Sequence, residues 1–215
     1  MPDNPHAMLL LGPTGSGKSP LGDLISEKGL SPRRCHHFDF GSELRRVASG
    51  RVPADLFPDN ERQFVRSVLE DGVLLEDRHF RLAEKIFLAF KDRTGFSRDD
   101  AVVLNGLPRH EGQAKDMAML VNVCGVVVLE CSADVIYERI RLDTGGDRGE
   151  RDDDAFHLVE KKLDIFHSRT QPLIQHYRNS GSWVMHLDVH AGSIPGDTHD
   201  MFMSALGKEK NGCLR

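Results

Sequence analysis

The chain has 215 residues, 39% of them hydrophobic, and a formal net charge of −5. Its length and composition suit one large domain with a substantial core, and its acidic balance argues against nucleic-acid binding, which needs a basic face. No run of the sequence approaches the ~18 apolar residues of a membrane span, and residues 1–6 lack the basic start of a signal peptide, so we expect a cytoplasmic protein with neither nucleic acid nor a membrane as its partner.

The first predicted elements enclose a glycine-rich loop. An apolar run over residues 7–11 predicts a buried strand, and apolar residues at helical spacing over 21–25 predict a helix. Between them, residues 12–19 read Gly-Pro-Thr-Gly-Ser-Gly-Lys-Ser, which fits the phosphate-binding pattern G-x-x-x-x-G-K-[ST]. A glycine-rich turn without a ligand also fits the bare pattern, but the strand before it and the helix after it favour phosphate binding.

The side chains of this loop suit ATP with Mg²⁺. Its glycines let the backbone turn tightly, so that successive N–H groups form a nest for phosphate oxygens at the start of a helix. Lys18 can reach the β- and γ-phosphates, and the hydroxyl of Ser19 can ligate Mg²⁺. The residues that we assign to ATP binding in this loop are Gly12, Gly15, Ser16, Gly17, Lys18 and Ser19.

The next segment predicts a short strand followed by a helical insertion. Residues 36–40 are typical of a strand, whereas 42–48 and 61–70 carry helical patterns separated by glycine and proline. We therefore assign residues 40–75 to a small helical insertion. Two histidines follow Cys35, but no further ligand stands at the spacing of a metal site, so ordinary strand residues are the favoured interpretation.

Strands and helices alternate over the rest of the chain. This pattern predicts a parallel sheet covered by helices on both faces, with ligands bound at the carboxyl ends of the strands. Pro172 should kink the longest predicted helix. The predicted helices cover residues 76–91, 111–122, 133–142, 152–179 and 198–206, and the predicted strands cover 101–104, 126–129 and 183–187.

Two further features concern a loop and the cysteines. Residues 143–151 are polar and rich in glycine, and they fit a solvated surface loop and a mobile lid with glycine hinges equally well. The cysteines form no C-x-x-C pair, so we expect buried free thiols in a reducing compartment. They are Cys35, Cys124, Cys131 and Cys213.

Six segments resemble, in the expected order, the motifs of adenylate kinases and related nucleoside monophosphate kinases. They are the phosphate-binding loop, HFDFGSELR at 37–45, DGVLL at 71–75, LNGLPR at 104–109 with Gln113, RDDD at 151–154 and TQPLIQHY at 170–177. The resemblance implies an α/β fold of the P-loop kind. This is a three-layer, doubly wound fold with a five-stranded parallel sheet. It also implies a single domain over 1–215, with a core over 1–39, 76–142 and 152–215, an acceptor-binding insertion over 40–75 and a short lid over 143–151.

The resemblance further implies a reaction, namely reversible transfer of a phosphoryl group from ATP-Mg²⁺ to a nucleoside monophosphate, here AMP. Such transfer needs positive charge around the phosphates. The catalytic residues implied are Lys18, Arg109, Arg151 and Lys162. Arg139 would lie over the base of ATP, and the acceptor would be bound by Phe40, Arg45, Leu75, Arg109 and Gln113. Mg²⁺ would be held by Ser19 and, through water, by Asn105.

Several positions depart from the family's pattern. Phe40 stands where adenylate kinases have a threonine, Asn105 replaces an aspartate, and Lys162 replaces an arginine. Asp143 stands near the place of a lid arginine, and the lid has no cysteines, so we expect no zinc. Two alternatives therefore stay open beside an AMP kinase acting as a monomer. One is a kinase of another monophosphate or small acceptor, and the other is a nucleotide-binding module with little or no transfer activity.

Overall fold

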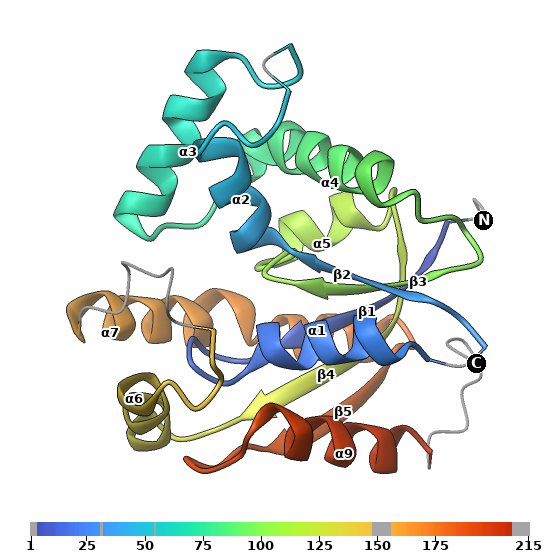
Figure 1. The fold of residues 1–215 in the computed structure, drawn as a ribbon, viewed down its shortest axis with the longest axis vertical. Helices are drawn as coiled ribbons and strands as arrows, with labels where there is room; N and C mark the ends of the chain where they lie inside the picture. Colours follow the sequence, from blue (N-terminus) through green and yellow to red (C-terminus); the bar gives the residue numbers. More distant parts are fainter. Residues whose placement is uncertain (1–3, 31, 54, 148–155, 208–215) are drawn as a thin grey trace.

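Five parallel strands in the described part of the chain form one sheet (Figure 1). The computed structural model describes residues 4–30, 32–53, 55–147 and 156–207. The strands are β1 (His6–Leu11), β2 (Cys35–Asp39), β3 (Ala101–Asn105), β4 (Asn122–Glu130) and β5 (Trp183–Asp188), in the order β2-β3-β1-β4-β5. Neighbouring strands that are far apart in sequence require crossover connections, which here contain helices. The predicted α/β fold with a five-stranded parallel sheet is confirmed.

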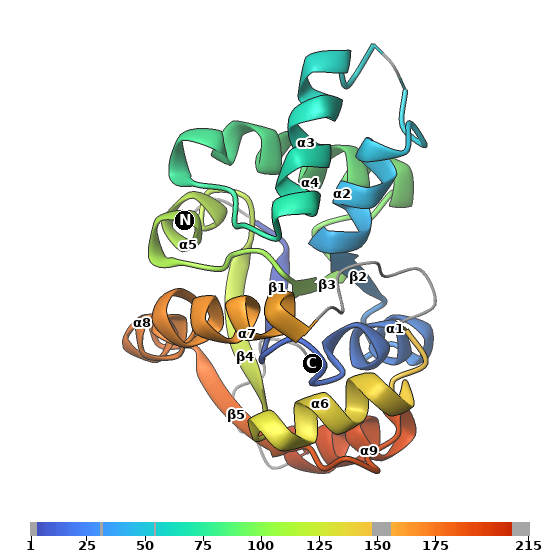
Figure 2. The ribbon, with the colours of Figure 1, turned by 90° about the vertical axis from the view of Figure 1, so that its left-hand side faces the viewer.

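Helices cover both faces of this sheet. They are α1 (Lys18–Lys28), α2 (Phe40–Ala48), α3 (Asp59–Asp71), α4 (Phe80–Thr94), α5 (Glu111–Met117), α6 (Ala133–Leu142), α7 (Phe156–Ile165), α8 (Leu173–Asn179) and α9 (Pro195–Leu206), with a 3₁₀ turn at Asp77–His79 and a π-helical turn at Phe166–Thr170. Helices α1 and α9 pack on one face, whereas α4, α5 and α8 pack on the other (Figures 1 and 2). The three layers follow from this arrangement.

Strand β1 shows why the sheet has two cores. Successive side chains of a strand point to opposite faces. Met8 and Leu10 belong to the core that includes Phe202 of α9, whereas Ala7 and Leu9 belong to the core that includes Phe87 of α4. These four residues of β1 are each at most 1% exposed. The continuous apolar run over 7–11 is therefore the signature of a central strand that is buried on both faces.

The segment 40–75 forms a helical unit beyond the carboxyl end of β2. In Figure 1, α2 and α3 lie at the upper left, and α6 lies at the lower left. The apolar side of α2 packs against α3 through Leu44 and Val47, which join Val65 and Val68 in the core cluster that also reaches α4. The unit is thus connected to the main core by apolar packing rather than standing apart.

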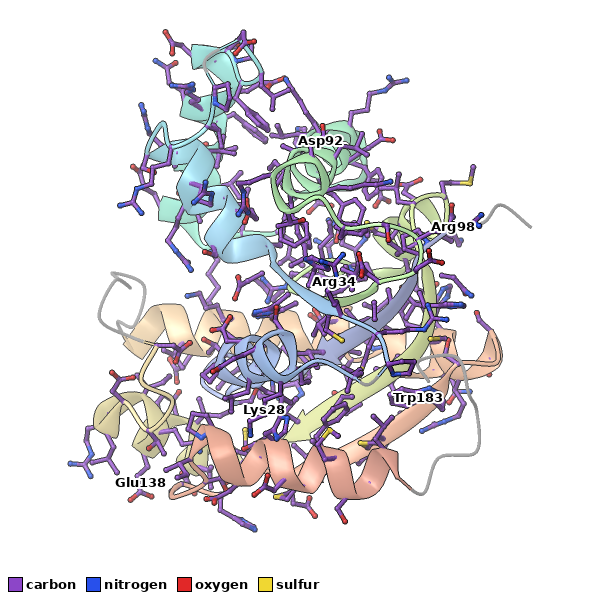
Figure 3. All side chains as sticks on the ribbon, turned by 45° about the vertical axis from the view of Figure 1, so that its right-hand side comes forward. Lys28, Arg34, Asp92, Arg98, Glu138 and Trp183 are labelled. Carbon is purple, nitrogen blue, oxygen red and sulfur yellow. The ribbon has the colours of Figure 1, made fainter. Side chains whose placement is uncertain are left out.

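The predicted helix over 111–122 is too long. Helix α5 ends at Met117, and β4 already begins at Asn122, whose N–H donates to the carbonyl of Pro5. Gly125 precedes the predicted strand 126–129 but lies inside β4, where the ring of Trp183 (Figure 3) occupies the space that a Cβ would take. Tertiary pairing therefore extends the strand beyond its apolar stretch.

The long helix predicted over 152–179 is divided. Its first residues, 152–155, lie outside the described part, and the rest forms α7, the π-helical turn and α8. The N–H of Gln171 donates to the carbonyl of Phe166, five residues earlier. Pro172 cannot donate a backbone hydrogen bond and stands at the start of α8, so the interruption falls just before the proline where a kink was expected.

The predictions for the cysteines and for membranes have separate outcomes. Cys35 and Cys131 are free thiols. Cys124 is disulfide-bonded, so the prediction of a free thiol is wrong at this position. None of the described helices combines the length and the apolar character that a membrane crossing requires.

Candidate active site

A cleft lies at the carboxyl ends of β1, β2 and β3, with an empty volume of about 1090 Å³ when the part open to solvent is included. The glycine-rich loop, the insertion, the segment after β3 and helix α7 all contribute to its wall. Many of the predicted site residues line it, namely Gly15, Gly17, Lys18, Ser19, Phe40, Arg45, Leu75, Asn105, Arg109, Gln113 and Lys162. The fold therefore brings residues from distant segments of the chain to one place.

The glycine-rich loop wraps around the start of α1. Gly17 is the N-terminal cap of this helix and has a φ of 94°, a conformation that favours glycine. Lys18 folds back over the loop, because its Nζ donates to the carbonyl oxygens of Gly12 and Pro13 at 2.8 and 2.7 Å. The hydroxyl of Ser16 is buried and has no hydrogen-bond partner among the described residues. The loop has the form of an anion-binding nest with its lysine positioned above it.

Three polar side chains meet below the loop. The Ser19 hydroxyl donates to Oδ2 of Asp39 at 2.5 Å, and Nδ2 of Asn105 donates to the same Oδ2 at 2.8 Å. Nδ2 of Asn105 also lies 3.0 Å from Oγ of Ser19. We did not predict a role for Asp39. Asp39 is the last residue of the strand before the insertion, and this position could have indicated a role in the site. Its pairing with Asn105 follows only from the register of the sheet.

These three residues also suit the hard cation that accompanies ATP. Mg²⁺ prefers oxygen ligands, and it often retains waters that carboxylates and carbonyl groups hold in place. Ser19 supplies a hydroxyl and Asp39 a carboxylate, so the donor set fits, while Nδ2 of Asn105 donates to both side chains. Among the described residues, no cluster of three or more His, Cys, Asp or Glu side chains could hold a metal by protein ligands alone.

Arg109 approaches the same cluster from the segment after β3. Burial lowers the pKa of its guanidinium, and the negative charge of Asp39 opposes this shift. The backbone on both sides is anchored, because the N–H of Arg109 donates to Oε1 of Gln113 and its carbonyl accepts from the Thr170 hydroxyl. Arg109 is thus a cation held in a partly dehydrated position beside a carboxylate.

Gln113 and Leu75 form the far wall of the cleft. The side chain of Gln113 is 1% exposed, and its Nε2 donates to the carbonyl of Leu75 at 2.8 Å. Oε1 of the same amide accepts from the backbone N–H of Arg109 at 2.8 Å. Both contacts together fix the plane of the amide, and one N–H and one oxygen lone pair remain for other partners.

Phe40 and Arg45 come from helix α2. Phe40 is 5% exposed and packs on Phe38, with 6.0 Å between the ring centroids. It therefore joins the core cluster while it lines the cleft. Arg45 is half-buried and lines the cleft one turn further along the helix.

The charged residues in and after the predicted lid differ from those that the motif resemblance implies. Arg151 lies outside the described residues. Asp143 caps the end of α6 and accepts a hydrogen bond from the N–H of Asp147 at 3.1 Å. Among the described residues that line the cleft, this segment contributes Asp147 rather than Asp143, and α7 contributes Lys162.

Arg139 occupies a buried position behind the glycine-rich loop. It is 3% exposed, and its Nε donates to the carbonyl of Gly15 at 3.0 Å. Its Nη1 donates to the carbonyl oxygens of His190 and Ser193 at 2.8 and 2.7 Å. This guanidinium therefore ties the loop to the segment between β5 and α9, and the described lining of the cleft does not include it.

Comparison with known proteins agrees with these features. The chain is 29% identical over 198 residues to the adenylate kinase of Synechococcus sp. strain CC9311, which covers 89% of this chain and 93% of that protein. It is 29% identical over 221 residues to the adenylate kinase of Natronomonas pharaonis, with 93% and 96% covered, and 28% identical over 203 residues to that of Clostridium tetani, with 80% and 86% covered. The chain is adenylate kinase-like. No protein-family model matches it. The likeness to the adenylate kinases spans most of the chain, not the glycine-rich loop alone.

Proposed function

We propose that this adenylate kinase-like protein transfers a phosphoryl group reversibly from ATP-Mg²⁺ to a nucleoside monophosphate, with AMP as its preferred acceptor. One observation carries the proposal. Lys18 of the phosphate-binding loop lines the same cleft as Arg45, Arg109 and Lys162, which come from three other segments. The γ-phosphate of ATP and the phosphate of the acceptor would thus lie between cationic side chains from different segments of the chain.

This arrangement suits the chemistry of phosphoryl transfer. An oxygen of the acceptor phosphate bonds to the γ-phosphorus of ATP while the bond from that phosphorus to the bridging oxygen breaks, which yields two nucleoside diphosphates. Catalysis consists mostly of positioning and charge stabilisation. Lys18 would hold the transferred group, and the planar guanidinium groups of Arg45 and Arg109 would hold the acceptor phosphate in bidentate contacts. Lys162 would add a point charge, and bound Mg²⁺ would neutralise phosphate charge.

The choice of AMP rests on Gln113. An adenine edge presents one hydrogen-bond acceptor and one donor side by side. The amide of Gln113 is already fixed by Leu75 and Arg109, and it retains one donor and one acceptor of its own. A preoriented amide loses little freedom when it binds a base, which favours affinity. The ring of Phe40 would add an apolar face beside that base.

A coupled assay of ADP formation from ATP-Mg²⁺ against a panel of monophosphates tests the proposal. We expect the largest kcat/KM with AMP, and a loss of AMP preference in Gln113→Leu, which removes both hydrogen-bonding groups at similar volume. A strong preference of the wild type for CMP, UMP or GMP would refute the assignment of Gln113.

Phe40 favours a second candidate, a kinase of another monophosphate or small acceptor. Its buried ring replaces a polar group at the base site, so recognition of adenine there depends more heavily on Gln113. The same panel separates the two candidates. ATP binding without product from any monophosphate would instead leave a nucleotide-binding module. A cytoplasmic location and a monomeric state are further predictions from the sequence.

A further inference from the structure

The cluster of Ser19, Asp39 and Asn105 places one carboxylate beside the phosphate-binding serine. Asp39 ends β2 and Asn105 ends β3, and the two residues are direct partners in the parallel register. Oδ2 of Asp39 accepts from both the Ser19 hydroxyl and the Asn105 amide, at 2.5 and 2.8 Å. The negative charge at this edge of the sheet therefore stands on β2, while β3 carries a neutral donor that points at it.

Helix capping does not explain this charge. Oδ1 of Asp39 accepts from the backbone N–H of Ser42 at 2.9 Å and caps α2. Asparagine and serine cap helices about as well as aspartate, so the cap alone requires no carboxylate. The second oxygen, Oδ2, is directed away from the cap and toward Ser19. The two oxygens of Asp39 thus have separate partners, and the partners of Oδ2 are Ser19 and Asn105, which line the cleft.

A carboxylate at this place would repel a polyphosphate unless a cation lies between them. The loop that Asp39 contacts through Ser19 is built to hold phosphate, and Lys18 and Arg109 line the same cleft. A carboxylate that repels metal-free ATP and attracts the Mg²⁺ of the ATP complex makes the affinity for ATP depend on Mg²⁺.

We propose that Asp39 supplies the carboxylate that anchors Mg²⁺ beside Ser19, through a metal-bound water or directly, and that Asn105 positions it. This inference rests on the proposed function, because it concerns the metal that accompanies ATP. In the motif pattern the carboxylate stands at position 105 on β3, whereas here it stands at Asp39 on the neighbouring strand β2. Asn105 is a positioning residue here, since its amide donates to Oδ2 rather than adding charge.

Isothermal titration calorimetry of ATP, once with excess Mg²⁺ and once with EDTA, tests this directly. We expect Asp39→Asn, which keeps the helix cap, to lose about 10–100-fold of the affinity gain that Mg²⁺ gives the wild type. Without Mg²⁺ the same variant should bind ATP more tightly than the wild type, because a repulsive charge is gone. The double variant Asp39→Asn with Asn105→Asp, which moves the charge to β3, should recover most of the metal dependence.

Two controls keep the result interpretable. Glu27→Gln removes one negative charge from the exposed end of α1 and should leave both affinities unchanged. Asp39→Ser retains a capping hydroxyl and serves in place of Asp39→Asn if the latter does not fold, which circular dichroism checks. A metal dependence that survives unchanged in folded Asp39 variants would overturn the inference and leave the proposed function intact. Absence of ATP binding in the wild type under both conditions would overturn both.

Discussion

Lys18 carries the charge that the proposed reaction needs most directly. Its Nζ donates to the carbonyl oxygens of Gly12 and Pro13, and the residue lines the cleft. Lys18→Met retains the length of the side chain and removes the charge. We expect turnover to fall by about 10²–10³-fold or more, with an unchanged circular dichroism spectrum. Near-normal turnover in a folded Lys18→Met protein would contradict the mechanism.

Asn105→Asp tests the cluster of Ser19, Asp39 and Asn105. It places a second carboxylate beside that of Asp39, where Nδ2 of Asn105 now lies 2.8 Å from Oδ2 of Asp39. Two like charges at this distance favour a shared proton, so the pKa of the pair should rise above that of an ordinary aspartate. A raised folded-state pKa costs stability once the pH exceeds it. We expect the loss in the free energy of unfolding to be larger at pH 7 than at pH 4 in metal-free buffer. Asn105→Ala, which adds no charge, is the control and should show no such pH dependence.

Among the elements, the start of β3 depends on Asp100, a buried carboxylate. Burial by itself would raise the pKa of Asp100, but hydrogen bonds from the Ser97 N–H, from Arg34 (labelled in Figure 3) and from the Ser97 hydroxyl hold it below its usual value. A lowered folded-state pKa gives stability above the unfolded-state pKa, and this stability is lost as the pH falls through the folded-state pKa. Asp100 therefore joins the turn before β3 to the start of β2 in its ionised form.

We expect Asp100→Asn to lower the free energy of unfolding by about 1–3 kcal/mol at pH 7 and by less near pH 3. Chemical denaturation at the two pH values measures this difference. Its exposed neighbour provides the matched variant, because Asp99→Asn changes the same functional group at the surface and should have little effect at either pH. An equal loss for Asp100→Asn at both pH values would show that the ionised form is not what stabilises the turn.

The contact between β4 and β5 depends on a glycine. The ring of Trp183 lies where a side chain at position 125 would stand, and Gly125 pairs with Trp183 in the register. Gly125→Ala should therefore destabilise the protein by about 1–3 kcal/mol through overpacking. Gly192→Ala is the control, because a Cβ there meets no atom of the described structure within 4 Å. Thermal unfolding of both variants measures the difference, and equal melting temperatures would refute this account of the strand pair.

At the scale of the whole molecule, the insertion is joined to the opposite side of the cleft by a few polar contacts. Nζ of Lys161 on α7 donates to the carbonyl of Asp71 at the end of α3, and just after the insertion Glu76 pairs with Arg169 at 2.7 Å. Both contacts involve exposed side chains or half-exposed ones, and such pairs contribute little stability. These polar contacts therefore oppose a change in the position of the insertion relative to α7 only weakly.

We expect a bisubstrate analogue, two nucleosides joined by phosphates, to slow amide hydrogen exchange in residues 41–75 and 143–147. Cations on both sides of the cleft would then bind one polyphosphate and hold the insertion closed. The strands provide the internal reference, because their exchange should change little. Unchanged exchange in the insertion, together with measurable binding of the analogue, would argue against a closing motion.

The sequence by itself determined the phosphate-binding loop, the alternation of strands and helices, and most element positions. The predicted helix over 133–142 coincides with α6, and the apolar run at 7–11 is the centre of β1. These features depend on local properties, namely glycines at a turn, periodic apolar residues and caps. Such patterns are complete within a few residues, so no knowledge of distant contacts is needed to interpret them.

The tertiary structure decided which distant residues meet. Asp39 reaches Asn105 through the register of β2 and β3, and Arg139 binds the carbonyl oxygens of His190 and Ser193 across the molecule. The space beside Gly125 is filled by Trp183, 58 positions later by the numbering, and pairing with β1 extends β4 past the apolar run. A side chain's partners depend on strand order, register and packing. These are properties of the assembled sheet, which is why the sequence alone predicted several cations that line the cleft but not the carboxylate of Asp39.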